Sequence, residues 1–194
     1  VERSKVRLQR LKFINEVNIK KTIVDEESGH IDIDFLLEET QSGEFKVGAG
    51  YSDSSGAIFN VKVQQDNFLG KGNNVALEVE KSSYKKLLRY RNTNPYFTKD
   101  GISKSTSIVF SETDVSSTST ASYLSDTIAY GINYSVPISE TRSYGYGGEL
   151  VLTDYTTTVG SPSNVTNFIN KYGKSHLGLM VRASIIDDTR NRTV

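Results

Sequence analysis

The chain of 194 residues lacks cysteine and tryptophan, and it has three prolines, one methionine and two histidines. Without cysteine it can form no disulfide, no cysteine-ligated zinc or iron–sulfur site and no thiol-based catalytic centre. The two histidines, His30 and His176, are too few to build a multi-histidine metal site. The absence of cysteine and the scarcity of histidine therefore exclude several classes of metalloprotein and enzyme.

The sequence has no excess of either charge, with 23 basic and 23 acidic side chains. A general nucleic-acid binder needs a basic excess to neutralise phosphates, so we expect no nucleic-acid partner. No apolar run approaches the ~18–20 residues of a membrane helix. The first residues are charged and do not resemble a signal peptide. These absences exclude membrane-spanning helices, but membrane β-barrels remain possible because their strands need only alternate.

The first forty residues predict a helix over residues 1–11 and two strands over residues 13–24 and 31–39. A polar turn ending in Gly29 separates the two strands. One helix and two strands are too little to bury a stable core alone. We therefore interpret residues 1–41 as the end of an α+β module.

From residue 42 onward, apolar and polar residues alternate in segments close to the ~10 residues of a tilted membrane strand. In the clearest segment, apolar residues alternate with smaller residues. The apolar residues are Ile128, Tyr130, Ile132, Tyr134 and Val136. Similar segments contain the following apolar residues: Phe45, Phe59, Val75, Leu88, Ile108, Tyr144 and Leu177. The pattern predicts a mainly β region of eight antiparallel strands.

The connections between these strands differ in length on the two sides. Residues 67–73, 94–101 and 137–143 form short links on one side, whereas the other side includes longer polar loops at 114–126 and 153–174. This asymmetry is typical of outer-membrane barrels, as are tyrosines near strand ends. A soluble β-sandwich that acts as a binding module remains the alternative, since its strands also alternate.

No catalytic or cofactor motif stands out. Residues 173–175 end like a phosphate-binding loop, but Phe168 occupies the position of its opening glycine. Neighbouring carboxylates at 25–27 and 187–188 lack the glycine-spaced loop of a calcium site and are interpreted as solvated turn charges. We expect no catalytic residue, no metal, no cofactor and no enzymatic activity.

Several segments resemble, in the correct order, the BamA family of Gram-negative bacteria, the central subunits of the outer-membrane barrel-assembly (BAM) machinery. Residues 1–11 and 31–39 resemble the helix and final strand of that family's last polypeptide-transport-associated (POTRA) domain. Residues 43–52 resemble its first barrel strand, and residues 64–73, 94–101, 136–140 and 188–190 resemble its periplasmic turns. Each motif is short, but the ordered set covers nearly the whole chain and is specific.

The resemblance implies an antiparallel transmembrane β-barrel in the bacterial outer membrane. Residues 42–194 would be the N-terminal half of a sixteen-strand barrel, and residues 1–41 the periplasmic C-terminal part of a POTRA domain. The family's arginine motif in the sixth extracellular loop would lie beyond Val194.

The implied function is folding and insertion of β-barrel clients through a lateral gate whose strand edge acts as a template. The implied partners are unfolded outer-membrane β-barrel clients, accessory assembly lipoproteins that bind the POTRA region, and membrane lipid. The expected first strand of the gate comprises Phe45, Lys46, Val47, Gly48, Ala49, Gly50 and Tyr51. The expected periplasmic turns contain Asn67, Phe68, Gly70, Gly72, Asn94, Pro95, Tyr96, Phe97 and Gly101.

Two membrane alternatives stay open: a polypeptide-translocating barrel of the same superfamily and a passive porin-like barrel. A further alternative concerns the gate itself. Gly48 and Gly50 could weaken the seam of the barrel, or they could relieve crowding inside it.

Overall fold

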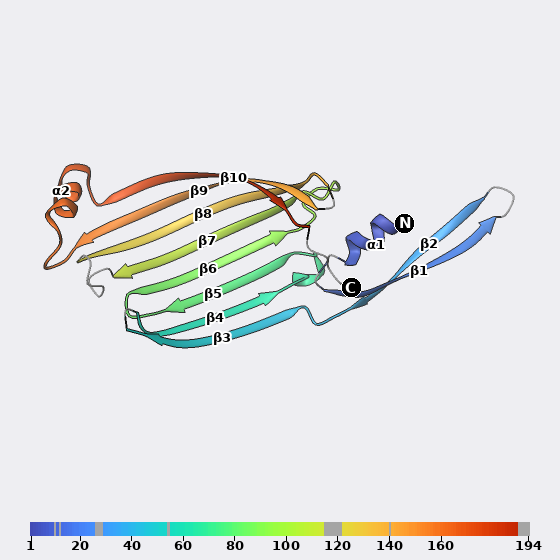
Figure 1. The fold of residues 1–194 in the computed structure, drawn as a ribbon, viewed down its shortest axis with the longest axis horizontal. Coiled ribbons are helices and arrows are strands. Elements are labelled where there is room, and N and C mark those ends of the chain that lie inside the picture. Colours follow the sequence, from blue (N-terminus) through green and yellow to red (C-terminus); the bar gives the residue numbers. More distant parts are fainter. Residues whose placement is uncertain are drawn as a thin grey trace.

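The computed structural model describes residues 1–9, 11, 13–25, 29–53, 55–114, 122–139 and 141–189. It contains a small N-terminal module and a large sheet (Figure 1). The module consists of α1 (Glu2–Gln9), β1 (Ile14–Asp25) and β2 (His30–Glu39). These elements confirm the predicted helix and two strands, while residues 26–28 of the predicted turn lie outside the described residues.

The N-terminal module has a very small core. Strands β1 and β2 pair antiparallel, and α1 packs against β1. Val17 is 1% exposed and Ile14 is 8% exposed, whereas Ile23 and Leu36 lie on the surface. Because an isolated two-stranded hairpin is marginally stable, this module depends on further contacts for its stability.

The large sheet contains eight strands that pair antiparallel in chain order. Their bounds are β3 (Gly43–Ser52), β4 (Gly56–Gln65), β5 (Asn74–Lys81), β6 (Lys85–Asn94), β7 (Ser103–Asp114), β8 (Tyr123–Pro137), β9 (Arg142–Thr157) and β10 (Ser175–Asp187). The eight predicted strands are thereby confirmed. The sheet is open within the described residues, with β3 and β10 at its two edges (Figure 1).

The strand alternation gives the sheet two different faces. We call the face that carries Phe45, Tyr130 and Leu179 the outer face, and the opposite one the inner face. On the outer face Tyr130 is 46% exposed and Leu179 is 70% exposed. A soluble sandwich would bury such residues between two sheets. The exposed apolar face therefore does not fit that alternative, and it suits contact with lipid.

A helix within the predicted loop 153–174 corrects the sequence interpretation. Strand β9 continues to Thr157, and α2 (Ser163–Tyr172) follows Pro162. Its apolar residues Val165, Phe168, Ile169 and Tyr172 have helical spacing, and Ile169 is buried. The helix therefore forms because the apolar residues of this largely polar segment lie on one side of it. Within the described residues, no helix is long and apolar enough to cross a membrane.

Candidate functional site at the free edge of the sheet

Strand β3 forms one edge of the large sheet. It pairs with β4 along its whole length, from Gly43 opposite Gln65 to Ser52 opposite Gly56. No other strand of the described chain pairs with β3. A strand edge presents backbone N–H and C=O groups that can pair with another strand. The predicted gate residues 45–51 all lie on this edge strand.

On the inner face, the middle of the β3–β4 pair combines a like-charged pair with two glycines. Lys46 lies opposite Lys62, a pair of like charges, and Gly48 lies opposite Asn60. The Lys46 ammonium instead lies 2.6 Å from the Glu44 carboxylate of the same strand. Like charges directly opposite one another destabilise a pair of strands. Strand β3 is therefore weakly attached on this face.

The two glycines of β3 have open space around them. A Cβ atom built at Gly50 would have no neighbouring atom within 4 Å, and one built at Gly48 would lie 3.9 Å from Asn60 Cβ. Neither position requires a glycine to relieve crowding in the described chain. Both glycines nevertheless weaken the strand, because they provide no side chain for packing.

The outer face of β3 is apolar and strongly exposed. Phe45 is 67% exposed, Val47 66% and Tyr51 77%. These side chains continue the apolar outer face of β4, where Phe59 is also exposed. The edge strand therefore combines an unpaired backbone edge with an apolar face.

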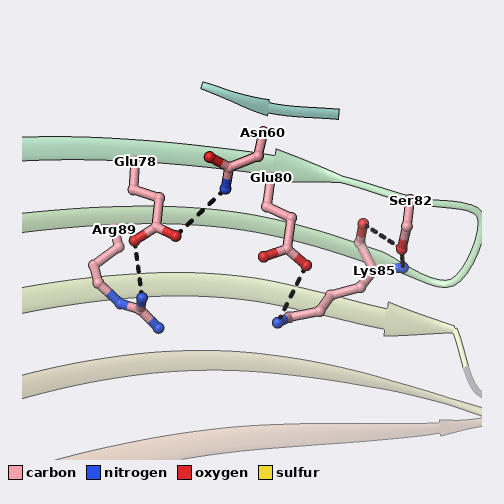
Figure 2. Close-up of polar contacts among 6 residues, drawn as sticks. All are labelled: Asn60, Glu78, Glu80, Ser82, Lys85 and Arg89. Carbon is pink, nitrogen blue, oxygen red and sulfur yellow. Dashed lines mark hydrogen bonds and ion pairs between the residues drawn. The ribbon is translucent and has the colours of Figure 1, made fainter. Parts of the chain in front are cut away.

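An ion-pair network on the inner face joins the strands beside this edge (Figure 2). Arg89 of β6 donates to a Glu78 carboxylate oxygen of β5 at 3.0 Å, and Asn60 of β4 donates to the other oxygen at 3.5 Å. Lys85 lies 3.5 Å from Glu80. These partly exposed pairs are individually worth about 1 kcal/mol or less. Together they connect β4, β5 and β6 on the inner face.

The first predicted periplasmic turn, residues 67–73, has a strained backbone. Asn67 and Leu69 have φ values of 55° and 54°, and Gly70 and Gly72 both have φ of +71°. The Gly72 N–H donates to the Asn67 side-chain oxygen at 2.8 Å. Glycine is favoured at positive φ because it has no Cβ, which accounts for two glycines in this turn. Phe68 lies in its single 3-10 turn, Phe68–Gly70.

The end of β4, directly before the first turn, is hydrogen-bonded to Ser42, which precedes β3. The Asp66 N–H donates to the Ser42 carbonyl at 2.7 Å, and the Gln65 side-chain amide donates to the Ser42 hydroxyl at 2.6 Å. Strand β3 is therefore joined to the end of β4 where it starts, whereas the middle of its inner face carries the like-charged pair Lys46–Lys62 and two glycines.

The second predicted turn, residues 94–101, contacts the N-terminal module. The Tyr96 N–H donates to the Asn94 side-chain oxygen at 3.0 Å, and Gly101 has φ of +86°. Pro95 follows the end of β6, where it removes no hydrogen bond from the sheet. The Tyr96 hydroxyl donates to the Arg7 carbonyl of α1 at 3.1 Å. Sequence reasoning missed this contact, because its partners are 89 residues apart.

The second turn also packs on the outer face through Phe97, whose ring centroid lies 6.0 Å from that of Tyr134 on β8. Both turns lie at the end of the sheet nearest the N-terminal module (Figure 1). Tyr51, by contrast, ends up at the opposite end of β3, beside the chain reversal to β4. The predicted site residues thus lie on the edge strand β3 and in two turns at the end of the sheet nearest the N-terminal module.

The predicted titratable candidates form no reactive centre in the described residues. His176 lies in an aromatic cluster, with its ring centroid 4.8 Å from that of Phe168 and 5.8 Å from that of Tyr155. Among the side chains that the structure describes, no group of three or more His, Asp or Glu residues could hold a metal ion.

A family model described as the Omp85 superfamily domain matches residues 67–194. The chain belongs to the Omp85 superfamily. It is also similar to an outer membrane protein assembly factor BamA from Neisseria meningitidis serogroup B, with 29% identity over 177 residues, covering 90% of this chain and 22% of that protein. The BamA of Buchnera aphidicola is 34% identical over 97 residues, covering 50% of this chain and 16% of that protein. The chain thus spans about a fifth of the length of these relatives.

Two solved structures share the fold. BamA from Haemophilus ducreyi lacking POTRA domains 1–3 matches with a TM-score of 0.74 at 23% identity, covering 99% of this chain and 39% of that one. CdiB from Acinetobacter baumannii matches with a TM-score of 0.60 at 15% identity, covering 98% of this chain and 38% of that one. The predicted resemblance to the BamA family and the predicted antiparallel barrel-type fold are confirmed, with eight strands present in an open sheet.

Proposed function

We propose that this chain is part of an outer-membrane assembly factor that folds and inserts β-barrel clients, with β3 as the first strand of a lateral gate. The observation that carries the proposal is the edge of β3, which is unpaired within the described chain and weakly attached on its inner face. The names of the BamA relatives support the same function.

The physical task of such a factor is to protect strand edges in lipid. Each unsatisfied backbone N–H or C=O group costs several kcal/mol in a membrane interior. A client strand that pairs with the edge of β3 satisfies these groups by β-augmentation. Weak attachment of β3 lowers the free energy needed to separate it from its neighbouring strands while a client strand pairs with its edge. The process requires no covalent step and no cofactor.

The proposal places the large sheet in the bacterial outer membrane, with its outer face against lipid. Residues 1–41 then form the C-terminal part of a periplasmic POTRA domain, and the turns at 67–73 and 94–101 lie on the same side. Within the described chain β1 and β2 pair only with each other, and client segments or accessory lipoproteins would bind at their other edges.

Disulfide locking in the full-length protein tests the gate, and these 194 residues contain no native cysteine that could compete with one introduced in β3. A cysteine at Ala49 paired with one in the strand that closes the barrel against β3 is expected to abolish client insertion under oxidising conditions. Reduction is expected to restore it. The control pair, Val47→Cys with Val61→Cys on β4, joins two opposite residues and leaves the edge free. Unchanged insertion by the oxidised gate pair would refute the proposal.

The two other membrane functions give different results in reconstituted vesicles. A polypeptide-translocating barrel would export a partner chain and leave client insertion at background. A passive porin-like barrel would conduct ions without inserting clients. Client insertion and partner export are separate readouts, so this assay decides between the functions.

A further inference from the structure

A pocket of about 420 Å³ lies on the inner face of the sheet, at the end nearest the N-terminal module. Its lining includes Lys62 of β4 and Arg91 of β6, and we call it the basic pocket. Leu11 and Phe13 of the N-terminal module also line it. The Thr40 N–H donates to the Phe13 carbonyl at 3.0 Å and so fixes this part of the module. The basic pocket is therefore formed where the module meets the sheet.

The two cations of the basic pocket have no charged partner in the described chain. Neither Lys62 nor Arg91 forms an ion pair with a residue that the structure describes. Glu78 lies opposite Lys62 in register, but its two oxygens accept from Arg89 at 3.0 Å and from Asn60 at 3.5 Å. Lys62 and Arg91 are therefore available to an external anion.

The charges around the basic pocket favour an anion. Asp66 is the carboxylate in its lining, and the Asp66 Oδ1 accepts from the Asn74 side-chain amide and from the Gln64 amide at 3.5 Å. Two cations thus face one carboxylate, and that carboxylate is bonded to neutral donors. Lys46 lies directly opposite Lys62 and adds a further positive charge beside the pocket. A cleft with an excess of one sign of charge attracts ligands of the opposite sign.

The strand register places the two cations around a shared space. Gln64 lies opposite Ala76, and Ala76 lies opposite Arg91. Because Lys62 is two residues before Gln64, the Cα atoms of Lys62 and Arg91 are about 12 Å apart. A carboxylate between them can accept two parallel bonds from the arginine fork and one from the flexible lysine.

The remaining lining of the basic pocket fits a polypeptide. Leu11, Phe13 and Pro95 provide apolar contacts, while Asn67 and Thr93 provide polar groups that can bond to a peptide backbone. The pocket also lies on the inner face, away from the exposed apolar outer face that suits lipid. An acidic residue flanked by apolar ones matches this combination of surfaces.

We propose that the basic pocket binds an acidic side chain of a client polypeptide as the client enters at this end of the sheet. The carboxylate lies between Lys62 and Arg91, and neighbouring apolar residues of the client contact Leu11 and Phe13. The bound anion also offsets the repulsion between Lys62 and Lys46 of the gate strand β3. This inference rests on the proposed function, which supplies the client and its direction of entry.

Peptide binding to the full-length protein in mild detergent tests the basic pocket. The probe is a fluorescent ten-residue peptide of alternating apolar and polar residues, with both ends blocked and one central aspartate. The comparison peptide has asparagine at that position. Fluorescence anisotropy is expected to show at least tenfold tighter binding of the aspartate peptide to the wild type. Equal affinity for the two peptides would overturn the proposal, and this comparison needs no variant to fold.

Paired variants locate the preference. Lys62→Gln/Arg91→Gln is expected to lower the affinity for the aspartate peptide to that for the asparagine peptide. The matched control, Lys81→Gln/Lys86→Gln, removes the same charge from a facing pair on β5 and β6, on the outer face, and should change the preference less than twofold. A preference that survives in Lys62→Gln/Arg91→Gln would overturn the proposal.

Charge reversal gives a test in the opposite direction. Lys62→Glu/Arg91→Glu is expected to bind a peptide with a central lysine more tightly than the aspartate peptide, and a retained preference for aspartate would contradict the pocket.

Client insertion is measured on the same samples. Normal insertion by a wild type without any preference for aspartate would contradict the pocket alone. A clear preference in a protein whose oxidised gate pair still inserts clients would contradict the gate alone.

Discussion

The same Gly-x-Gly pattern occurs in two strands of the sheet, at Gly48 and Gly50 of β3 and at Gly145 and Gly147 of β9. All four glycines face the inner side, but their surroundings differ. A Cβ at Gly147 would lie 2.6 Å from the carbonyl oxygen of Ile132, whereas a Cβ at Gly50 would have nothing within 4 Å. In β9 the glycines allow close packing between neighbouring strands. In β3 they leave the strand loosely attached, as a proposed gate requires.

The largest effect is expected for Gly147→Ala. The new methyl group would collide with the Ile132 carbonyl and with the Asn133 side-chain oxygen. Because a backbone carbonyl cannot move without disturbing the sheet, we expect a loss of about 2–3 kcal/mol in unfolding free energy. Urea unfolding of the protein in lipid vesicles measures this loss. Adding Asn133→Gly should recover only part of it, and a full recovery would show that the backbone contact is unimportant.

A smaller effect is expected for Gly145→Ala. Its Cβ would lie 2.5 Å from the Ser184 hydroxyl, which belongs to a side chain that can rotate away. We therefore expect a loss of about 1 kcal/mol, below that of Gly147→Ala. The same urea titration measures it, and the added substitution Ser184→Ala should restore stability. An equal loss of unfolding free energy in Gly147→Ala and Gly145→Ala would show that crowding against a backbone carbonyl costs no more than crowding against a side chain.

The contrast between the two Gly-x-Gly pairs shows how far the sequence could predict the structure. Alternating residues predicted all eight strands, because a period of two is a local property. The crowding at Gly147 depends on which residue of β8 lies opposite it, and a one-residue change of register would remove that contact. The like-charged pair Lys46–Lys62 depends on register in the same way.

Two other features, helix α2 and a long-range hydrogen bond, are not predicted by the sequence, and the reasons differ. Residues 153–174 predict a polar loop because serine, threonine and glycine are frequent in them, although the apolar residues of α2 have helical spacing. The hydrogen bond from Tyr96 to Arg7 joins two distant parts of the chain. No local pattern could have indicated it, because only the tertiary arrangement brings α1 next to the second turn.

The attachment of β3 can be strengthened through its charges. Lys46→Glu places a carboxylate opposite Lys62, so the like-charged pair between β3 and β4 becomes an attractive one, while the Lys46–Glu44 ion pair within β3 is lost. We expect β3–β4 pairing to gain about 0.5–1 kcal/mol and client insertion to slow several-fold. Insertion kinetics in vesicles measure this effect. Lys46→Gln is the control, since it removes the repulsion without adding attraction and should slow insertion less.

The smallest effect on stability is expected for Gly50→Ala, and it tests the role of the open space most directly. The methyl group has room, and alanine loses less conformational entropy than glycine when the strand forms. We therefore expect stability to rise by about 0.5 kcal/mol, in contrast to the losses in β9. If weak attachment of β3 serves the gate, insertion should slow although the protein becomes more stable. Faster or unchanged insertion together with higher stability would show that the β3 glycines do not set the rate of gate opening.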